Sequence, residues 1–174
     1  MTEGDWFQGD EPRSDDEVRF LARLRGLADG WHLPGLPPER TGCLAVLTPL
    51  LVTVEHPSLR GGFGLTELQV GYWPPKPTGL RLEGEWGDEY LLDNGGDLTD
   101  LRIEGVSAEP EYFAEAAANW LRAQLLRPIE RLEWSKGDRI VATRIRIAEG
   151  GQTLASRGSW FRTRRRADRM ARLN

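Results

Sequence analysis

The sequence is poor in the side chains that build covalent or metal-held frameworks. Cys43 is the only cysteine, and His32 and His56 are the only histidines, among 174 residues. A disulfide or a cysteine-based zinc site within one chain is therefore excluded. A chain of this length buries roughly 70% of the surface that its unfolded form exposes, so its core needs neither. We expect no cofactor and no metal.

Long apolar runs and targeting signals are also lacking. The N-terminus is acidic, and no run approaches the ~18 apolar residues that a membrane span needs. The longest apolar stretch, 44–54, is interrupted by Thr48, Pro49 and Thr53 and is typical of a bent, buried strand. We therefore expect a cytoplasmic protein that engages no membrane.

The modest net charge of −4 conceals an uneven layout along the chain. Residues 1–17 carry seven acids and one base (net −6), whereas residues 157–174 carry seven arginines and one aspartate (net +6), and the rest supplies −4. Only two of the 23 bases are lysine, an arginine bias that GC-rich codons produce, so we expect a bacterial source. The chain is dipolar rather than polycationic.

Two helices are predicted by apolar residues with a period of 3.6. The first covers 14–29, where the spacing of Ser14 and Glu17 fits a capping box. The second covers 109–127 and has Pro110 in its first turn. The apolar stripe of this second helix predicts that it packs across a sheet.

Alternating apolar and polar residues predict strands on both sides of the second helix. Two short connections between them, 135–138 and 149–152, are typical of hairpins. The predicted strands cover 43–55, 65–73, 79–86, 89–92, 100–105, 129–134, 139–148 and 152–161.

The order of these elements favours an α+β fold. We expect a mostly antiparallel, twisted sheet or half-barrel of about seven or eight strands, with one long helix packed on it, an N-terminal helix and a short basic C-terminal helix. The composition of residues 1–13 predicts a flexible acidic tail. Trp6 and Phe7 are its only apolar pair and could anchor the tail to another surface. Residues 14–161 then form a single domain, and residues 162–174 form a basic helix or tail.

Arginines gather in the last three predicted strands. If the two hairpins are symmetric about 136/137 and 150/151, Arg144 lies opposite Arg157 on one face of the sheet. Like charges that face each other directly are unfavourable by about a few tenths of a kcal/mol unless an acid lies over them. Three sources of counter-charge stay open: acids of the same domain such as Glu133, the acidic tail, or an external acidic partner.

The terminal segment 162–174 carries its arginines at helical spacing. A helix this short is marginal alone, so it needs a docking surface or a partner. Together with the arginines of the strands, these residues form the candidate partner-binding set. The set consists of Arg131, Arg144, Arg146, Arg157, Arg162, Arg165, Arg166, Arg169 and Arg172.

Signatures of catalysis are scarce in the chain. It contains no G-x-S-x-G elbow, and its glycine-rich stretch 60–64 lacks the Gly-Lys-Ser/Thr of a phosphate-binding loop. Glu83 and Glu85 alternate with apolar residues as on a solvated sheet face. A small enzyme with a pocket built on His32 or His56 and the acids near 83–100 remains an alternative.

The sequence as a whole predicts a non-catalytic binding or accessory protein. Its arginines would engage an acidic protein surface, because guanidinium groups pair with carboxylates. A nucleic-acid backbone is the alternative partner for the same arginines. The sequence also leaves open whether the protein forms a homo-oligomer.

Overall fold

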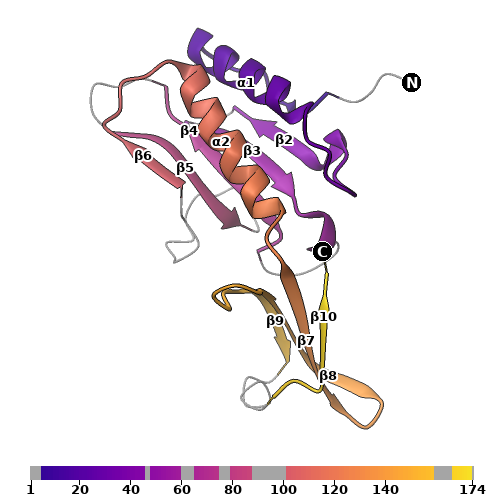
Figure 1. The fold of residues 1–174 in the computed structure, drawn as a ribbon. Helices are drawn as coiled ribbons and strands as arrows, with labels where there is room; N and C mark the ends of the chain where they lie inside the picture. The colour runs from indigo at the N-terminus through magenta and orange to yellow at the C-terminus, as the bar shows by residue number, and fades with distance from the viewer. Residues whose placement is uncertain are drawn as a thin grey trace.

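The computed structural model describes residues 5–45, 48–59, 65–74, 79–87, 101–158 and 166–173. These residues form two α-helices, a mixed six-stranded sheet and a four-stranded antiparallel sheet, and neither sheet is closed. The predicted α+β class is therefore confirmed. The prediction of one sheet or half-barrel is wrong, because the strands after the second helix form a sheet of their own (Figure 1).

The larger sheet follows the order of the chain, β1-β2-β3-β4-β5-β6. β1 pairs with β2 in parallel, and every other neighbouring pair is antiparallel. Short 3-10 turns precede β2 and follow β3. The strands are β1 (Gln8–Gly9), β2 (Thr41–Leu44), β3 (Leu50–Glu55), β4 (Glu67–Tyr72), β5 (Leu80–Gly87) and β6 (Leu101–Glu104). The predicted strand 89–92 falls outside the described residues.

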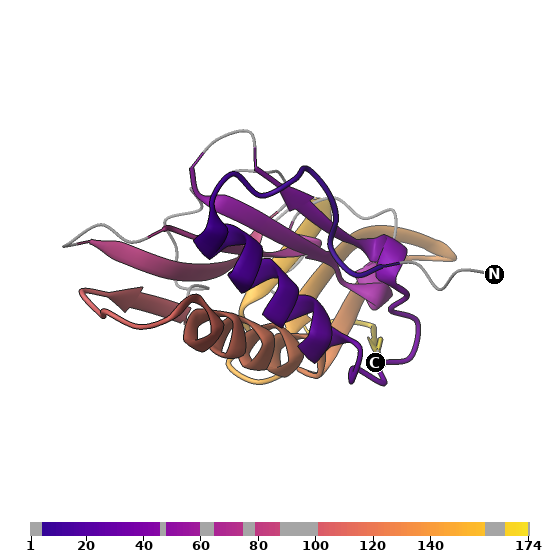
Figure 2. The ribbon, with the colours of Figure 1, turned by 90° about the horizontal axis from the view of Figure 1, so that it is seen from above.

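Two helices, α1 (Asp15–Ala28) and α2 (Pro110–Leu125), lie side by side on one face of this sheet (Figures 1 and 2). The predicted cap of α1 is confirmed, since the Ser14 hydroxyl accepts a hydrogen bond from the backbone N–H of Glu17 at 3.2 Å. Both helices begin and end within two residues of the predicted limits.

An aromatic core fills the space between the helices and the sheet. The rings of Phe20 and Tyr72 are stacked with centroids 4.3 Å apart, and Phe113 lies against Tyr72 at 5.8 Å. Trp86 is fully buried, and its indole N–H donates to the side-chain oxygen of Gln124 at 3.2 Å. The large apolar side chains of strands and helices thus meet in one layer.

The described part of the acidic N-terminal segment packs on the same layer. Trp6 and Phe7 are buried, and the Arg25 guanidinium donates to both of their backbone carbonyls at 2.9 Å. Residues 8–9 extend the sheet as β1. The docking anchor that Trp6 and Phe7 were expected to supply therefore lies in the core.

The second sheet projects from the end of α2, and we call it the β-arm and the remainder the body (Figure 1). Its strand order is β10-β7-β8-β9, all antiparallel. Ile129, Ile147 and Leu154 at its root are buried in the core of the body. The strands are β7 (Ile129–Lys136), β8 (Arg139–Ile147), β9 (Thr153–Gly158) and β10 (Arg169–Arg172).

The C-terminal segment differs from its prediction. Residues 169–172 form strand β10 and not a helix, because they pair along the free edge of β7. That pairing supplies backbone hydrogen bonds and a docking surface at once, whereas an isolated helix of this length is marginal. Arg162 and Arg165 of the predicted helix lie outside the described residues. No helix within the described ranges is long and apolar enough to cross a bilayer.

Candidate functional site

The pairing of β7, β8 and β9 decides which arginines share a face of the β-arm. The β7–β8 turn is two residues long, and a bulge between Trp134 and Ser135 shifts the register beyond it. In the β8–β9 pair, a register shift between Ile145 and Arg146 places Arg144 opposite Ser156 and Arg157 opposite Thr143. The predicted Arg144–Arg157 pairing is therefore wrong, since each one-residue shift moves a side chain to the other face.

The expected arginine face is consequently divided between the two faces of the β-arm. Directly paired residues point to the same side of an antiparallel sheet. One side carries Arg144 and Arg146 together with the pairing partners Leu132 and Glu130. The other side carries Arg131, Glu133, Thr143, Arg157 and Arg169.

Arginines on the first side are engaged within the β-arm. Arg146 donates from Nε and Nη2 to one carboxylate oxygen of Glu130, at 3.1 and 3.0 Å. The guanidinium of Arg144 lies 5.9 Å from the centroid of the Trp134 ring, within cation–π range. This side therefore supplies its own counter-charge and aromatic support.

Glu133 supplies the counter-charge on the second side. Its side chain is nearly buried and lies 2.8 Å from Nε of Arg131 and 3.9 Å from Nη1 of Arg169. One carboxylate therefore serves two guanidinium groups. Arg157, in the same cross-strand row, makes no ion pair with any residue that the structure describes.

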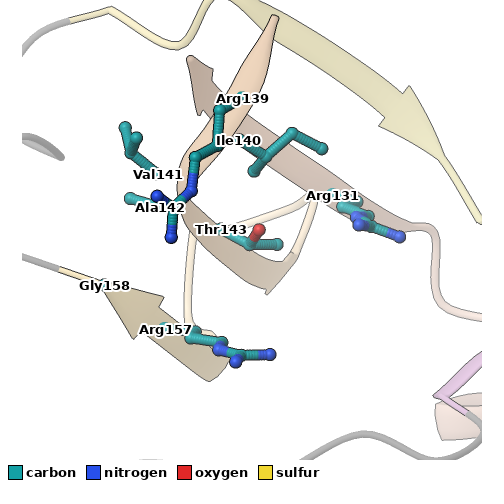
Figure 3. Close-up of a pocket in the computed structure, with 8 residues that line it drawn as sticks. All are labelled: Arg131, Arg139, Ile140, Val141, Ala142, Thr143, Arg157 and Gly158. Carbon is teal, nitrogen blue, oxygen red and sulfur yellow. The ribbon is translucent and has the colours of Figure 1, made fainter. Parts of the chain in front are cut away.

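A hollow of about 770 Å³ lies beside the β7–β8 turn, at the outer end of the β-arm. Figure 3 shows Arg131 and Arg157 reaching to the same side from β7 and β9, with Thr143 on β8 between them. Apolar side chains form part of its wall, and none of the described residues that line it carries a carboxylate. The lining residues are Arg131, Arg139, Ile140, Val141, Ala142, Thr143, Arg157 and Gly158.

Arg139 is the cation of this hollow that sequence reasoning missed. It is exposed, closes the β7–β8 turn opposite Lys136, and forms no ion pair within the described part of the chain. Its position as the first residue of a predicted strand after a short turn is the signal that could have placed it. Three of the described arginines therefore line the hollow, and of these Arg131 has a carboxylate partner.

Gly158 brings β9 close to β8 at the rim of the hollow. Its φ of +100° is a conformation that residues with a side chain rarely adopt. A Cβ at this position would also clash with the carbonyl oxygen of Val141 and with the backbone of Ala142. Glycine thus permits the close strand approach beside the bulge, and this approach shapes one wall of the hollow.

The remaining C-terminal arginines do not form one stripe with the hollow. Arg169 and Arg172 alternate along β10, and Arg166 precedes that strand; all three are exposed. Arg169 shares the side of Arg157, whereas Arg172 pairs in register with Glu130 on the opposite side. Arg162 and Arg165 fall outside the described ranges.

The acidic N-terminal segment, one expected source of counter-charge, is engaged on the body. Asp10 accepts a hydrogen bond from the backbone N–H of Ala45 at 3.0 Å, and Glu17 pairs with Arg13 at 2.8 Å. Both contacts lie beside α1 and β2, far along the molecule from the β-arm (Figure 1). Within the described chain, these acids leave the hollow uncovered.

Neither histidine belongs to a described hollow. His56 is almost fully buried, its Nδ1 accepts from the backbone N–H of Ser58 at 3.2 Å, and its ring lies 5.6 Å from that of Trp86. Burial lowers the pKa of His56 to about 4, and the Leu125 backbone opposes this in part. His32 is exposed on a loop. These environments are those of a neutral core histidine and a surface histidine.

Cys43 and Glu83, two further candidate catalytic groups, are held in structural environments. Burial raises the pKa of the Cys43 thiol to about 11, so it stays protonated. Glu83 pairs with Arg102 at 2.7 Å, and the acids from 88 to 100 lie outside the described residues. In the part of the chain that the structure describes, no three His, Cys, Asp or Glu side chains cluster to hold a metal ion.

Comparison with known proteins leaves the hollow as the starting point for function. No protein-family model, no curated protein and no solved structure matches the chain. A function is therefore inferred from the chemistry of the site alone.

Proposed function

We propose that this protein is a non-catalytic binding or accessory protein that engages an acidic protein surface through the hollow of the β-arm. One observation carries the proposal: Arg131, Arg139 and Arg157 line a concavity to which the described chain contributes no carboxylate. Arg139 and Arg157 have no ion-pair partner among the described residues. A carboxylate that enters beside Thr143 meets the guanidinium of Arg157, whereas the Arg139 side chain lies on the other side of β8 (Figure 3).

The composition of the hollow suits a protein interface. Arginine is enriched at interfaces because its planar guanidinium binds carboxylates in a bidentate manner and is weakly hydrated. Ile140, which is about half exposed, and Val141 supply apolar contact beside the charges. The Thr143 hydroxyl adds a donor and acceptor between Arg131 and Arg157.

A protein partner is favoured over a nucleic acid by two features of the molecule. Among the described residues that line the hollow, none has an aromatic side chain on which a base could stack. Residues 1–128 carry 11 bases and 22 acids, a net of −11, and this charge repels an extended phosphate backbone. A short acidic segment of a protein can bind to the β-arm without coming close to the negatively charged residues 1–128.

The test is fluorescence anisotropy with a labelled peptide of alternating Glu and Thr. We expect salt-sensitive binding that weakens by about tenfold for each guanidinium lost, since a hydrogen bond to a charged group contributes about 1.5–3 kcal/mol. The variant is the double substitution Arg139→Gln and Arg157→Gln. The matched control is Arg122→Gln, which removes an exposed arginine from α2 in the body.

Two further probes define the outcomes. A peptide of alternating Gln and Thr keeps the length and loses the charge, so it should not bind. A duplex DNA that contacts all three arginines would bind with a slope of log K against log salt of about −2.7. Tighter binding of the duplex than of the Glu/Thr peptide, or equal peptide binding by wild type and double variant, contradicts the proposal.

A further inference from the structure

The strand that carries Arg157 is an edge of the β-arm. β9 pairs with β8 on one side, and on its other side the only described partner is Leu65, whose N–H donates to the Leu154 carbonyl at 2.9 Å. That contact lies at the root of the β-arm. From Ala155 to Gly158 the outer edge of β9 makes no backbone hydrogen bond to any residue that the structure describes.

This part of β9 has the geometry of a template for another strand. Its residues from Ala155 to Gly158 pair with β8 in continuous register, and the irregularity in the pair lies nearer the root, beside Leu154. Ser156, Arg157 and Gly158 are exposed. The segment carries no proline or lysine, the residues that commonly block edge-to-edge pairing.

We infer that an extended acidic segment of a partner protein adds to the outer edge of β9 and places its carboxylates over Arg157 and into the hollow. This inference rests on the proposed function and specifies how the partner binds. Backbone hydrogen bonds to β9 would supply affinity, and alternate side chains would supply specificity. Because side chains alternate between the two faces of a strand, every second residue of the segment meets the arginines.

The charge of β9 argues for an acidic partner over a second copy of this chain. Arg157 is the only charged residue among residues 153–158. Pairing two β9 strands would bring an arginine from each copy to one short edge without an acid on either, and like charges across strands are unfavourable. Arg139, on the neighbouring strand of the same hollow, adds to this repulsion. An acidic strand would instead be attracted by both Arg157 and Arg139.

The experiment uses backbone methylation of the Glu/Thr peptide with the full-length protein. One peptide is N-methylated at every Glu and a second at every Thr, so that charge and side chains are unchanged. In an added strand, alternate N–H groups point toward the sheet and away from it. We expect one of the two methylated peptides to bind at least about tenfold more weakly than the other, because its hydrogen bonds to β9 are lost.

A peptide of the same composition with its Glu residues in one block and its Thr residues in another provides a second readout. It should bind more weakly than the alternating peptide, because only every second side chain of an added strand faces Arg157. The Arg157→Gln substitution should abolish binding of both the alternating peptide and the block peptide.

The outcomes separate this inference from the proposed function. If both methylated peptides bind as tightly as the parent, the edge of β9 is not used, while the proposed function stands. If the unmodified peptide does not bind at all, the proposed function fails and the inference fails with it. Sedimentation could instead show a dimer that dissociates when the peptide is added. A second copy of the chain would then occupy the edge of β9, and the inference that an acidic partner segment binds there would be wrong.

Discussion

The body and the β-arm differ in both charge and core. Residues 1–128 carry 11 bases and 22 acids (net −11), whereas residues 129–174 carry 12 bases and 5 acids (net +7). The body encloses a continuous aromatic and aliphatic core, while the outer half of the β-arm has a small cluster of its own, built on Leu132, Trp134 and Ala142. Stability and recognition are thus concentrated in different parts of the molecule.

The root of the β-arm joins these two regions. Ile129, Ile147 and Leu154 belong to the core of the body, so the arm is held at its base by buried apolar contact. Its outer end, with the hollow and the open edge of β9, has little core to stabilise it. A partner can therefore contact the outer end without disturbing the main core.

The largest expected effect comes from opening the core of the body with Phe113→Ala. Phe113 is fully buried against Tyr72, so its removal should lower the free energy of unfolding by about 3–5 kcal/mol. Denaturant unfolding followed by tryptophan fluorescence measures this loss. The matched control is Tyr112→Ala, the exposed neighbour on the same helix. Equal losses for the two variants would show that the body has no continuous core at α2.

A smaller, pH-dependent effect is expected where the body meets the β-arm. His56 accepts from the N–H of Ser58, whose hydroxyl donates to the carbonyl of Leu173 at 3.0 Å, just after β10. The folded pKa of His56 is lowered from 6.5 to about 4 by burial. Below about pH 6.5 the unfolded chain binds a proton that the folded chain excludes, so stability falls as the pH falls.

This loss should reach about 3 kcal/mol near pH 4 and vanish above about pH 7, where both states are neutral, at ~1.4 kcal/mol per pH unit. His56→Asn retains an acceptor for the Ser58 N–H but cannot take up the proton. Unfolding midpoints measured across this pH range should therefore be less steep for the variant than for wild type. Parallel curves would mean that the pKa of His56 is the same in the folded and the unfolded protein.

The helices and hairpins were predictable because their signals are local. The Ser14–Glu17 cap and the apolar stripes set the limits of α1 and α2 to within two residues. The turn at Gly137 and Asp138 likewise placed β7 and β8 next to each other. Each of these features depends on residues that are close in sequence.

The faces of the β-arm were not predictable, because they depend on pairing between strands. A one-residue register shift between Ile145 and Arg146 in the β8–β9 pair places Arg144 on the side opposite Arg157, and no local pattern marks it. The strand β10 was missed for a related reason. Arginine spacing along 162–172 fits a helix, and the open edge of β7 that recruits residues 169–172 exists only in the folded protein.

The smallest effects should separate the ion pairs of the two regions. Glu130→Gln in the β-arm removes the nearly buried acceptor of Arg146, whereas Glu115→Gln in the body breaks an exposed contact with Arg23. We expect losses in the free energy of unfolding of about 1–3 kcal/mol for Glu130→Gln and below about 1 kcal/mol for Glu115→Gln. Denaturant unfolding at low and high salt measures both, and salt should reduce the Glu115 effect more. A larger cost for Glu115→Gln would mean that charge pairing stabilises the body, and that its apolar core is not the main difference from the β-arm.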